Sequence, residues 1–163
     1  MVPLTNNVTR LLESKKIEFS AFETPDEKLG AIEVAHFLGV PLNVVFKTIV
    51  VVREKGKPVL AVIPGTAEVD LKALARELNE KKVSLPTERE AERLTGLQAG
   101  GISPLALINR GFTTILDSSA NQYASIHISG GQRGLNIRLP VQSLVALTNA
   151  RTARCSLMVW TSS

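Results

Sequence analysis

The stretch "TIVVVREKGKPVLAVIP", Thr48–Pro64, contains two runs of aliphatic and β-branched residues separated by the polar segment Glu54–Lys57. β-Branched residues favour strands, and the glycine inside the polar segment suits a tight turn between them. The stretch therefore predicts a β-hairpin, which makes the sheet that contains it largely antiparallel or mixed.

The segments on either side predict helices interspersed with further strands. Apolar residues at helical spacing next to capping residues indicate helices, which we expect after a cap at Thr5 or Asn6, within 30–39, after Asp70, from Thr87 to Gly96, and from Pro140 to Leu147. Shorter apolar runs indicate strands at 17–22, 83–85, 113–117, 123–129 and 135–139. This mixture predicts a single α+β domain over residues 1–150 with a mixed, largely antiparallel sheet, followed by an irregular tail at 151–163.

The composition is that of a globular protein with a slight excess of positive charge. Of 163 residues, 44% are hydrophobic and 21% are charged, and the formal net charge is +4. This charge is compatible with a polyanionic partner without requiring one. The single Cys155 excludes an internal disulfide and a cysteine-based zinc cluster, and fits a cytoplasmic protein. The N-terminal stretch does not contain the long apolar core expected of a signal peptide, and no apolar run is long enough to cross a membrane.

Three features are candidates for a functional site. Lys47 begins an aliphatic strand, so its stem is expected to be buried and its ammonium directed to a partner, unless the side chain extends into solvent. The loop "LQAGGISPLALI", Leu97–Ile108, brings Gly100 and Gly101 into an apolar run, where backbone amides could approach a ligand or where the chain turns tightly.

The third feature is the hairpin around "SGGQRG", Ser129–Gly134. Alternation places Ser125, His127 and Ser129 on one face of its first strand, and Asn136 and Arg138 on the corresponding face of its second. This polar face is either the wall of a cleft or the solvent-facing side of the sheet.

Together "VFKTIVV", "AGGISPL" and "ISGGQRGLNI" resemble, in this order, the YbaK family of aminoacyl-tRNA editing domains, also called the YbaK/ProX family. The resemblance covers about Thr5 to Leu147. It implies a mixed α+β fold on a strongly curved sheet, no metal and no cofactor. It also implies hydrolysis of amino acids wrongly attached to tRNA, typically cysteine or alanine on the proline tRNA.

The resemblance further implies which residues form the site. Lys47, Gly100 and Gly101 would be the catalytic residues, with the glycine amides holding the ester carbonyl. The remaining substrate-binding positions would be Phe22, Leu29, Thr48, Ile102, Ser103, Pro104, Ser129 and Asn136. No nucleophilic side chain is implied, so the thiol of a cysteinyl substrate, a ribose hydroxyl or water would attack. The implied partners are the acceptor end of aminoacyl-tRNA and prolyl-tRNA synthetase, and a homo-oligomer is compatible with the sequence.

Three positions depart from the family pattern. Asn136 stands where members often carry Asp, Phe22 where they often carry Tyr, and Leu29 where they often carry Phe. These changes bear on which amino acid is accepted. They also leave open a second function, a non-catalytic module that binds tRNA acceptor ends or a synthetase.

Overall fold

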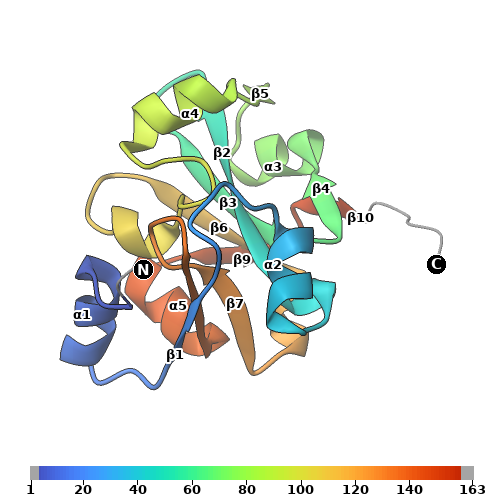
Figure 1. Ribbon diagram of the computed structural model, residues 1–163. Coiled ribbons are helices and arrows are strands. Elements are labelled where there is room, and N and C mark those ends of the chain that lie inside the picture. Colours follow the sequence, from blue (N-terminus) through green and yellow to red (C-terminus); the bar gives the residue numbers. More distant parts are fainter. Residues whose placement is uncertain (1–3, 159–163) are drawn as a thin grey trace.

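The computed structural model describes residues 4–158, in which helices and strands alternate along the chain (Figure 1). The helices are α1 (Asn7–Ser14), α2 (Ala31–Leu38), η1 (Leu42–Val44), α3 (Leu71–Glu77), α4 (Glu88–Thr95), η2 (Pro104–Leu107), η3 (Ser118–Gln122) and α5 (Val141–Thr148), where η marks a 3-10 helix. The strands are β1 (Ser20–Glu23), β2 (Phe46–Arg53), β3 (Val59–Pro64), β4 (Ala67–Val69), β5 (Val83–Ser84), β6 (Thr113–Asp117), β7 (Ser125–Ser129), β8 (Leu135–Pro140), β9 (Arg151–Ala153) and β10 (Ser156–Met158). None of the helices within these residues is long and apolar enough to cross a membrane.

The predicted hairpin at 48–64 is confirmed and forms the centre of the larger sheet. Within residues 4–158 this sheet has the strand order β5-β2-β3-β6-β9. β2 and β3 pair antiparallel, with Thr48 opposite Val62, whereas β3–β6 and β6–β9 are parallel pairs. The sheet is therefore mixed, as the sequence predicts.

The second predicted hairpin, β7 and β8, belongs to a separate antiparallel sheet with the order β1-β8-β7. A parallel bridge between Val45 and His127 connects this sheet to the start of β2. This contact brings the polar face of the second hairpin next to the beginning of the first, although the two are about 80 residues apart in sequence.

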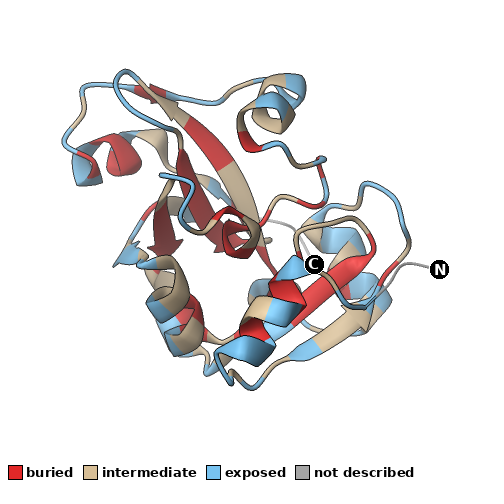
Figure 2. Cartoon of the chain, turned by 90° about the vertical axis from the view of Figure 1, so that its left-hand side faces the viewer, coloured by how far each residue is buried: buried red, intermediate tan, exposed pale blue. Residues whose placement is uncertain are grey.

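The hydrophobic core lies on both faces of the larger sheet (Figure 2). On one face Val51 and Ile63 pack with Leu74 of α3, and on the other Val50 and Leu60 pack with residues of α4 and the following loop. Burial on both faces explains why β2 and β3 are almost continuously apolar rather than alternating.

The predicted helix ends are largely confirmed. Asn6 caps α1 by accepting a hydrogen bond from the backbone N–H of Thr9, and Asp70 and Thr87 cap α3 and α4 in the same way. Gly39 ends α2 in the left-handed conformation that the absence of a side chain permits.

The end of the chain is more regular than the predicted irregular tail. Residues 151–158 contain β9, which extends the larger sheet beside β6, and β10, which pairs with β4. Both strands are three residues long and pair with elements distant in sequence, so no local pattern indicates them. Residues 159–163, including Trp160, lie outside the described part of the chain.

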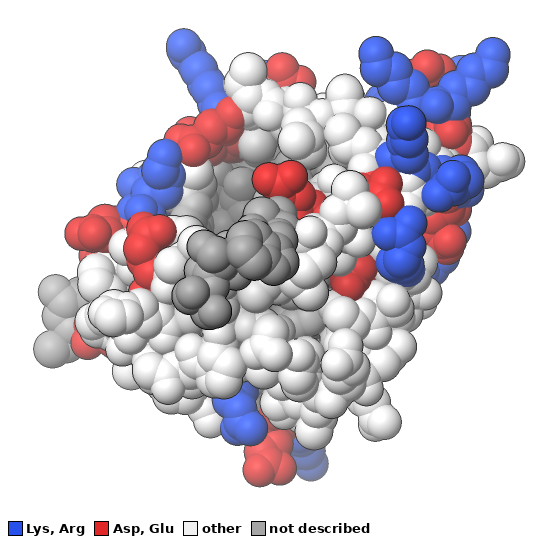
Figure 3. Space-filling view, turned by 90° about the vertical axis from the view of Figure 1, so that its right-hand side faces the viewer, with Lys and Arg blue, Asp and Glu red and all other residues white. Residues whose placement is uncertain are grey.

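The surface carries both signs of charge. On the face shown in Figure 3, Lys and Arg side chains gather toward one edge with acidic side chains among them, and large areas between carry no charge. Although the formal net charge of the chain is +4, this face does not present an uninterrupted basic surface, because acidic side chains lie among the basic ones.

Candidate functional site

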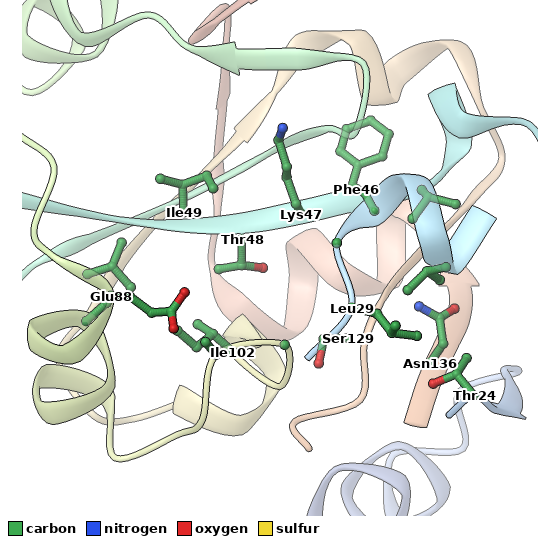
Figure 4. A pocket seen from close by; sticks show the side chains of 18 of the residues that line it. Thr24, Leu29, Phe46, Lys47, Thr48, Ile49, Glu88, Ile102, Ser129 and Asn136 are labelled. Carbon is green, nitrogen blue, oxygen red and sulfur yellow. The ribbon is translucent and has the colours of Figure 1, made fainter. Parts of the chain in front are cut away.

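A pocket of about 380 Å³ lies where the two sheets meet. It is bounded by β2, the chain leading into α2, the start of α4, the glycine loop and the second hairpin, and mixes apolar with a few polar side chains (Figure 4). The pocket therefore unites the three segments singled out in the sequence. Its lining residues include Thr24, Leu29, Lys47, Thr48, Glu88, Gly100, Ile102, Ser129 and Asn136.

Strand β2 contributes Lys47 and Thr48, whose side chains leave the strand on opposite sides (Figure 4). Thr48 points toward Ile102 and Ser129, and its hydroxyl oxygen is buried without a hydrogen-bond partner within residues 4–158. A buried hydroxyl without a partner is costly. The Thr66 hydroxyl is in the same situation although Thr66 is not among the described residues that line the pocket, so the missing partner alone does not assign Thr48 to the substrate.

Lys47 lies at the edge of the pocket, on the same side of β2 as Ile49 (Figure 4). It is half-buried, and this burial lowers the pKa of its ammonium group, while the nearby carboxylate of Glu68 acts in the opposite direction. In Figure 4 the Lys47 ammonium points away from the side of the pocket formed by Thr48, Ser129 and Asn136.

The glycine loop approaches other parts of the protein more closely than the sequence indicates. A Cβ atom on Gly101 would lie 2.8 Å from Cα of Gln132, and one on Gly100 would lie 3.1 Å from Cα of Lys28. Gly101 also donates its backbone N–H to the carbonyl of Gln98 at 2.8 Å. What comes close to Gly101 is therefore the turn of the second hairpin, and its amide is already used within the loop.

Four predicted positions are not among the residues that line this pocket in the described chain: Gly101, Ser103, Pro104 and Phe22. Ser103 and Pro104 are buried, and the Ser103 hydroxyl accepts a hydrogen bond from the N–H of Leu105 at the start of η2. These two residues fix the exit of the loop. Gly100 and Ile102, in contrast, do line the pocket.

The second hairpin contributes Ser129 and Asn136, which are opposite each other in register. Asn136 is buried and its Oδ1 lies 2.9 Å from Nδ1 of His127, which is also buried. The ring of Phe22 lies 5.5 Å from the ring of His127. The polar face of this hairpin is therefore divided between the two interpretations: Ser129 and Asn136 border the pocket, whereas Arg138 is exposed to solvent.

The mouth of the pocket includes residues that the sequence analysis did not single out. Glu88, at the start of α4, forms an ion pair with Lys28 at 3.0 Å, joining the two sides of the opening, and the side chain of Leu85 is exposed beside it. The capping pattern at Thr87 predicts where α4 begins, but no local signal places this end of the helix opposite Lys28.

Cys155 is buried in the core beside α3, on the other side of the larger sheet. Burial raises the pKa of its thiol to about 12, with the nearby Asp117 adding to the shift. A thiol in this environment stays protonated and inaccessible near neutral pH. Among residues 4–158 no three His, Cys, Asp or Glu side chains are grouped so that they could hold a metal ion.

Comparisons with known proteins identify the family of this chain. Residues 25–147 match the family model described as an aminoacyl-tRNA editing domain. An Enterococcus faecalis protein named "Putative Cys-tRNA(Pro)/Cys-tRNA(Cys) deacylase EbsC" is 38% identical over 149 residues, 90% of each chain. A proline–tRNA ligase of Thermodesulfovibrio yellowstonii is 32% identical over 122 residues, which are 75% of this chain and 20% of the ligase.

The fold has a matching relative among solved structures. A crystal structure described as "a putative trans-editing enzyme for prolyl tRNA synthetase" superposes with a TM-score of 0.78 at 26% identity, covering 95% of this chain and 99% of that one. The family resemblance drawn from the three motifs is thereby confirmed: the chain belongs to the family of aminoacyl-tRNA editing domains.

Proposed function

We propose that this protein is a hydrolase that removes wrongly attached amino acids from tRNA, with cysteine or alanine on the proline tRNA as the substrates. The observation that carries the proposal is the pocket in which Thr48, Gly100 and Asn136 meet, because all three lie within the region that matches the editing family. The relative named as a deacylase supports the same reaction, since it matches nearly the whole chain.

The size and lining of the pocket suit a small aminoacyl group. A volume of about 380 Å³ is near the lower end for small-molecule sites, and apolar side chains such as Leu29, Val34 and Ile102 narrow it. Small side chains such as those of cysteine and alanine would fit, whereas a large aromatic side chain would compete for the space needed by the terminal ribose.

The reaction requires breaking the ester bond between the amino acid carbonyl and the ribose oxygen. In this proposal Thr48 orients the ester through its unpartnered hydroxyl, and donors from the loop side stabilise the negative charge that develops on the carbonyl oxygen. Gly101 is not one of these donors, because its amide is bonded to Gln98. The substrate thiol or a water molecule attacks the carbonyl carbon, and the tRNA leaves with its hydroxyl restored.

Lys47 has a different role in this geometry. Its ammonium points away from Ser129 and Asn136, so we assign it to the phosphate backbone of the acceptor end at the pocket edge rather than to the carbonyl. With a formal charge of +4, affinity for tRNA alone is expected to be modest and to fall with salt. A synthetase partner would then supply most of the tRNA selectivity.

The second candidate is a module that binds aminoacyl-tRNA without turnover. The observation that favours it is Asn136, an uncharged side chain where family members often carry a carboxylate. A deacylation assay with tRNA charged separately with cysteine, alanine, serine and proline separates the two candidates, because only the enzyme releases free amino acid above the spontaneous rate.

The same assay tests the roles of the residues. Lys47→Ala should lose most deacylation at low tRNA concentration, and Lys55→Ala, which removes an exposed lysine from the β2–β3 turn, should not. If thiol attack operates, cysteinyl-tRNA should react far more than about a hundredfold faster than seryl-tRNA, because a pocket alone rarely separates such similar side chains by more. Unchanged rates for all four tRNAs with and without protein would refute the enzymatic function.

A further inference from the structure

We propose that His127 is a positioning residue for Asn136. By donating from Nδ1 to the Asn136 side-chain oxygen, His127 turns the Asn136 nitrogen into the pocket, where it donates to the carbonyl oxygen of the bound aminoacyl group. This inference rests on the proposed function and concerns how the same pocket recognises its substrate.

The hydrogen bond between the two side chains fixes the orientation of both. Asn136 Oδ1 and His127 Nδ1 are 2.9 Å apart, and each residue is only 4% exposed. A carboxamide oxygen can only accept, so the shared proton must sit on Nδ1 of the imidazole. Reversing the Asn136 amide would require the other tautomer of His127.

The packing around His127 leaves little freedom to its ring. The Phe22 ring lies 5.5 Å away at an interplanar angle of 43°, and the backbone of His127 pairs with Val45 on one side and with Arg138 on the other. Burial, reinforced by the positive charge of Arg138, lowers the pKa of His127, although its bond to Asn136 opposes this shift. The neutral ring that results has a single N–H group, and this group donates the hydrogen bond to Asn136.

The consequence appears on the pocket side of Asn136. Figure 4 shows the nitrogen of its side chain turned toward Leu29 and Ser129, and the oxygen turned away. The pocket is therefore offered N–H donors at this position. A donor suits a carbonyl oxygen, and it does not suit the ammonium group of an amino acid, which itself only donates.

A hydrogen bond to the carbonyl oxygen would also strengthen during the reaction. As the carbonyl is attacked, its oxygen gains negative charge, and a fixed amide donor stabilises that charge without needing to reorient. An aspartate at the same place would present oxygen atoms to this developing charge. The Asn136–His127 pair thus distinguishes a site that holds the carbonyl from one that holds the amine.

The test uses two analogues of the aminoacyl end that cannot be hydrolysed as esters. One is 3′-alanylamino-3′-deoxyadenosine, and the other is its 3′-propionylamino counterpart, which keeps the carbonyl and the size but lacks the amine. Binding of each to the wild type and to Asn136→Ala is measured by NMR titration. We expect Asn136→Ala to weaken both analogues by the same factor, about three- to tenfold, the usual effect of one hydrogen bond.

Variants of His127 test positioning separately. His127→Leu should weaken both analogues like Asn136→Ala, whereas His127→Gln, which can still donate to the Asn136 oxygen, should restore most of the binding. His36→Leu, which removes the exposed histidine of α2, is the control and should change neither affinity. Because His127→Leu could fold poorly, the tautomer is measured independently in the wild type by ¹⁵N NMR, where Nδ1 should carry the proton.

Three results would overturn the proposal. One is a loss in Asn136→Ala confined to the alanyl analogue, which would show that Asn136 binds the amine. The second is a proton on Nε2 of His127, and the third is failure of the wild type to bind either analogue. None of these readouts depends on turnover, so a protein that binds both analogues but does not deacylate tRNA would refute only the proposed function.

Discussion

Gly101→Ala tests whether the glycine loop is shaped by the protein or by its ligand. The added Cβ atom would lie 2.8 Å from Cα of Gln132 and 3.0 Å from the backbone nitrogen of Arg133, whereas ordinary van der Waals contact begins at 3.4 Å. Both neighbours are backbone atoms, so the turn of the second hairpin must move as a unit. Overpacking of this kind typically lowers the free energy of unfolding by about 1–3 kcal/mol.

For a chain of this length such a loss should lower the melting temperature by about 2–12 °C. The displacement should also reduce deacylation, because the moving turn lies between Ser129 and Asn136, and a shift of about 1 Å at a reacting group can cost about a hundredfold in rate. We therefore expect both stability and activity per folded molecule to fall.

Gly39→Ala is the control. This glycine has a φ of 68° and a Cβ atom there would meet nothing within 4 Å, so the substitution costs about 1 kcal/mol of conformational strain and leaves the pocket unchanged. Calorimetry and the deacylation assay are run on both variants. The contrary outcome is that Gly101→Ala melts within about 1 °C of the wild type and still loses activity. The close contact with the turn of the second hairpin would then not be the reason for a glycine at this position, and contact with a bound ligand would be.

Three further outcomes follow from the buried and capping groups. Asp70→Ala removes the cap of α3 and an ion pair with Arg154, so the free energy of unfolding should fall by about 1 kcal/mol near pH 7. Because the pKa of Asp70 is lowered in the folded protein, this difference from the wild type should shrink as acid protonates the carboxylate, which urea titrations from pH 7 to pH 3 measure. Cys155→Ala should leave deacylation unchanged, and the native thiol, with its pKa of about 12, should resist a disulfide reagent at pH 8 until the protein unfolds. The pKa of His127 is lowered in the folded protein, so as the pH falls the unfolded state takes up a proton first. The wild type should therefore lose stability below about pH 6.5, and urea titrations should show a weaker pH dependence for His127→Gln. An equal pH dependence in both proteins would exclude His127 as its source.

Much of the fold follows from local patterns, because the groups that determine it are near one another in sequence. β-Branched runs predict β2 and β3, and Asp70, Thr87 and Gly39 mark helix ends through bonds or conformations that involve only their immediate neighbours. In contrast β4, β9 and β10 are three residues long each and are formed by pairing with distant strands. The backbone hydrogen-bonding groups of these short strands are paired only through the tertiary structure, and the local sequence does not predict such pairing.

The candidate site shows the same division. The three motifs can be picked out in the sequence because each contains residues that are unusual for their surroundings: a lysine in an aliphatic strand, two glycines in an apolar run, and a polar face on a hairpin. The contacts that bring these motifs together, however, join residues that are far apart in the chain. The approach of Gly101 to Gln132 and the ion pair of Lys28 with Glu88 are examples. The alternation of the second hairpin alone does not show which part of its polar face borders the pocket, since its strand β8 pairs with β1, more than 100 residues earlier.

The opposite orientation of the Lys47 and Thr48 side chains is one feature of the site that the sequence predicts. Neighbouring residues of a strand point to opposite faces, so the sequence predicts that the side chains of Lys47 and Thr48 leave the strand in opposite directions. In the structure Thr48 takes the side of Ser129 and Asn136, and Lys47 takes the other (Figure 4). Under the proposed function, strand alternation would place Thr48 beside the ester and the Lys47 ammonium at the edge of the pocket, where it would meet the phosphates of the tRNA. We therefore expect the rate at saturating tRNA to depend on the placement of Asn136 and Thr48, and the loss in Lys47→Ala to be confined to low tRNA concentration.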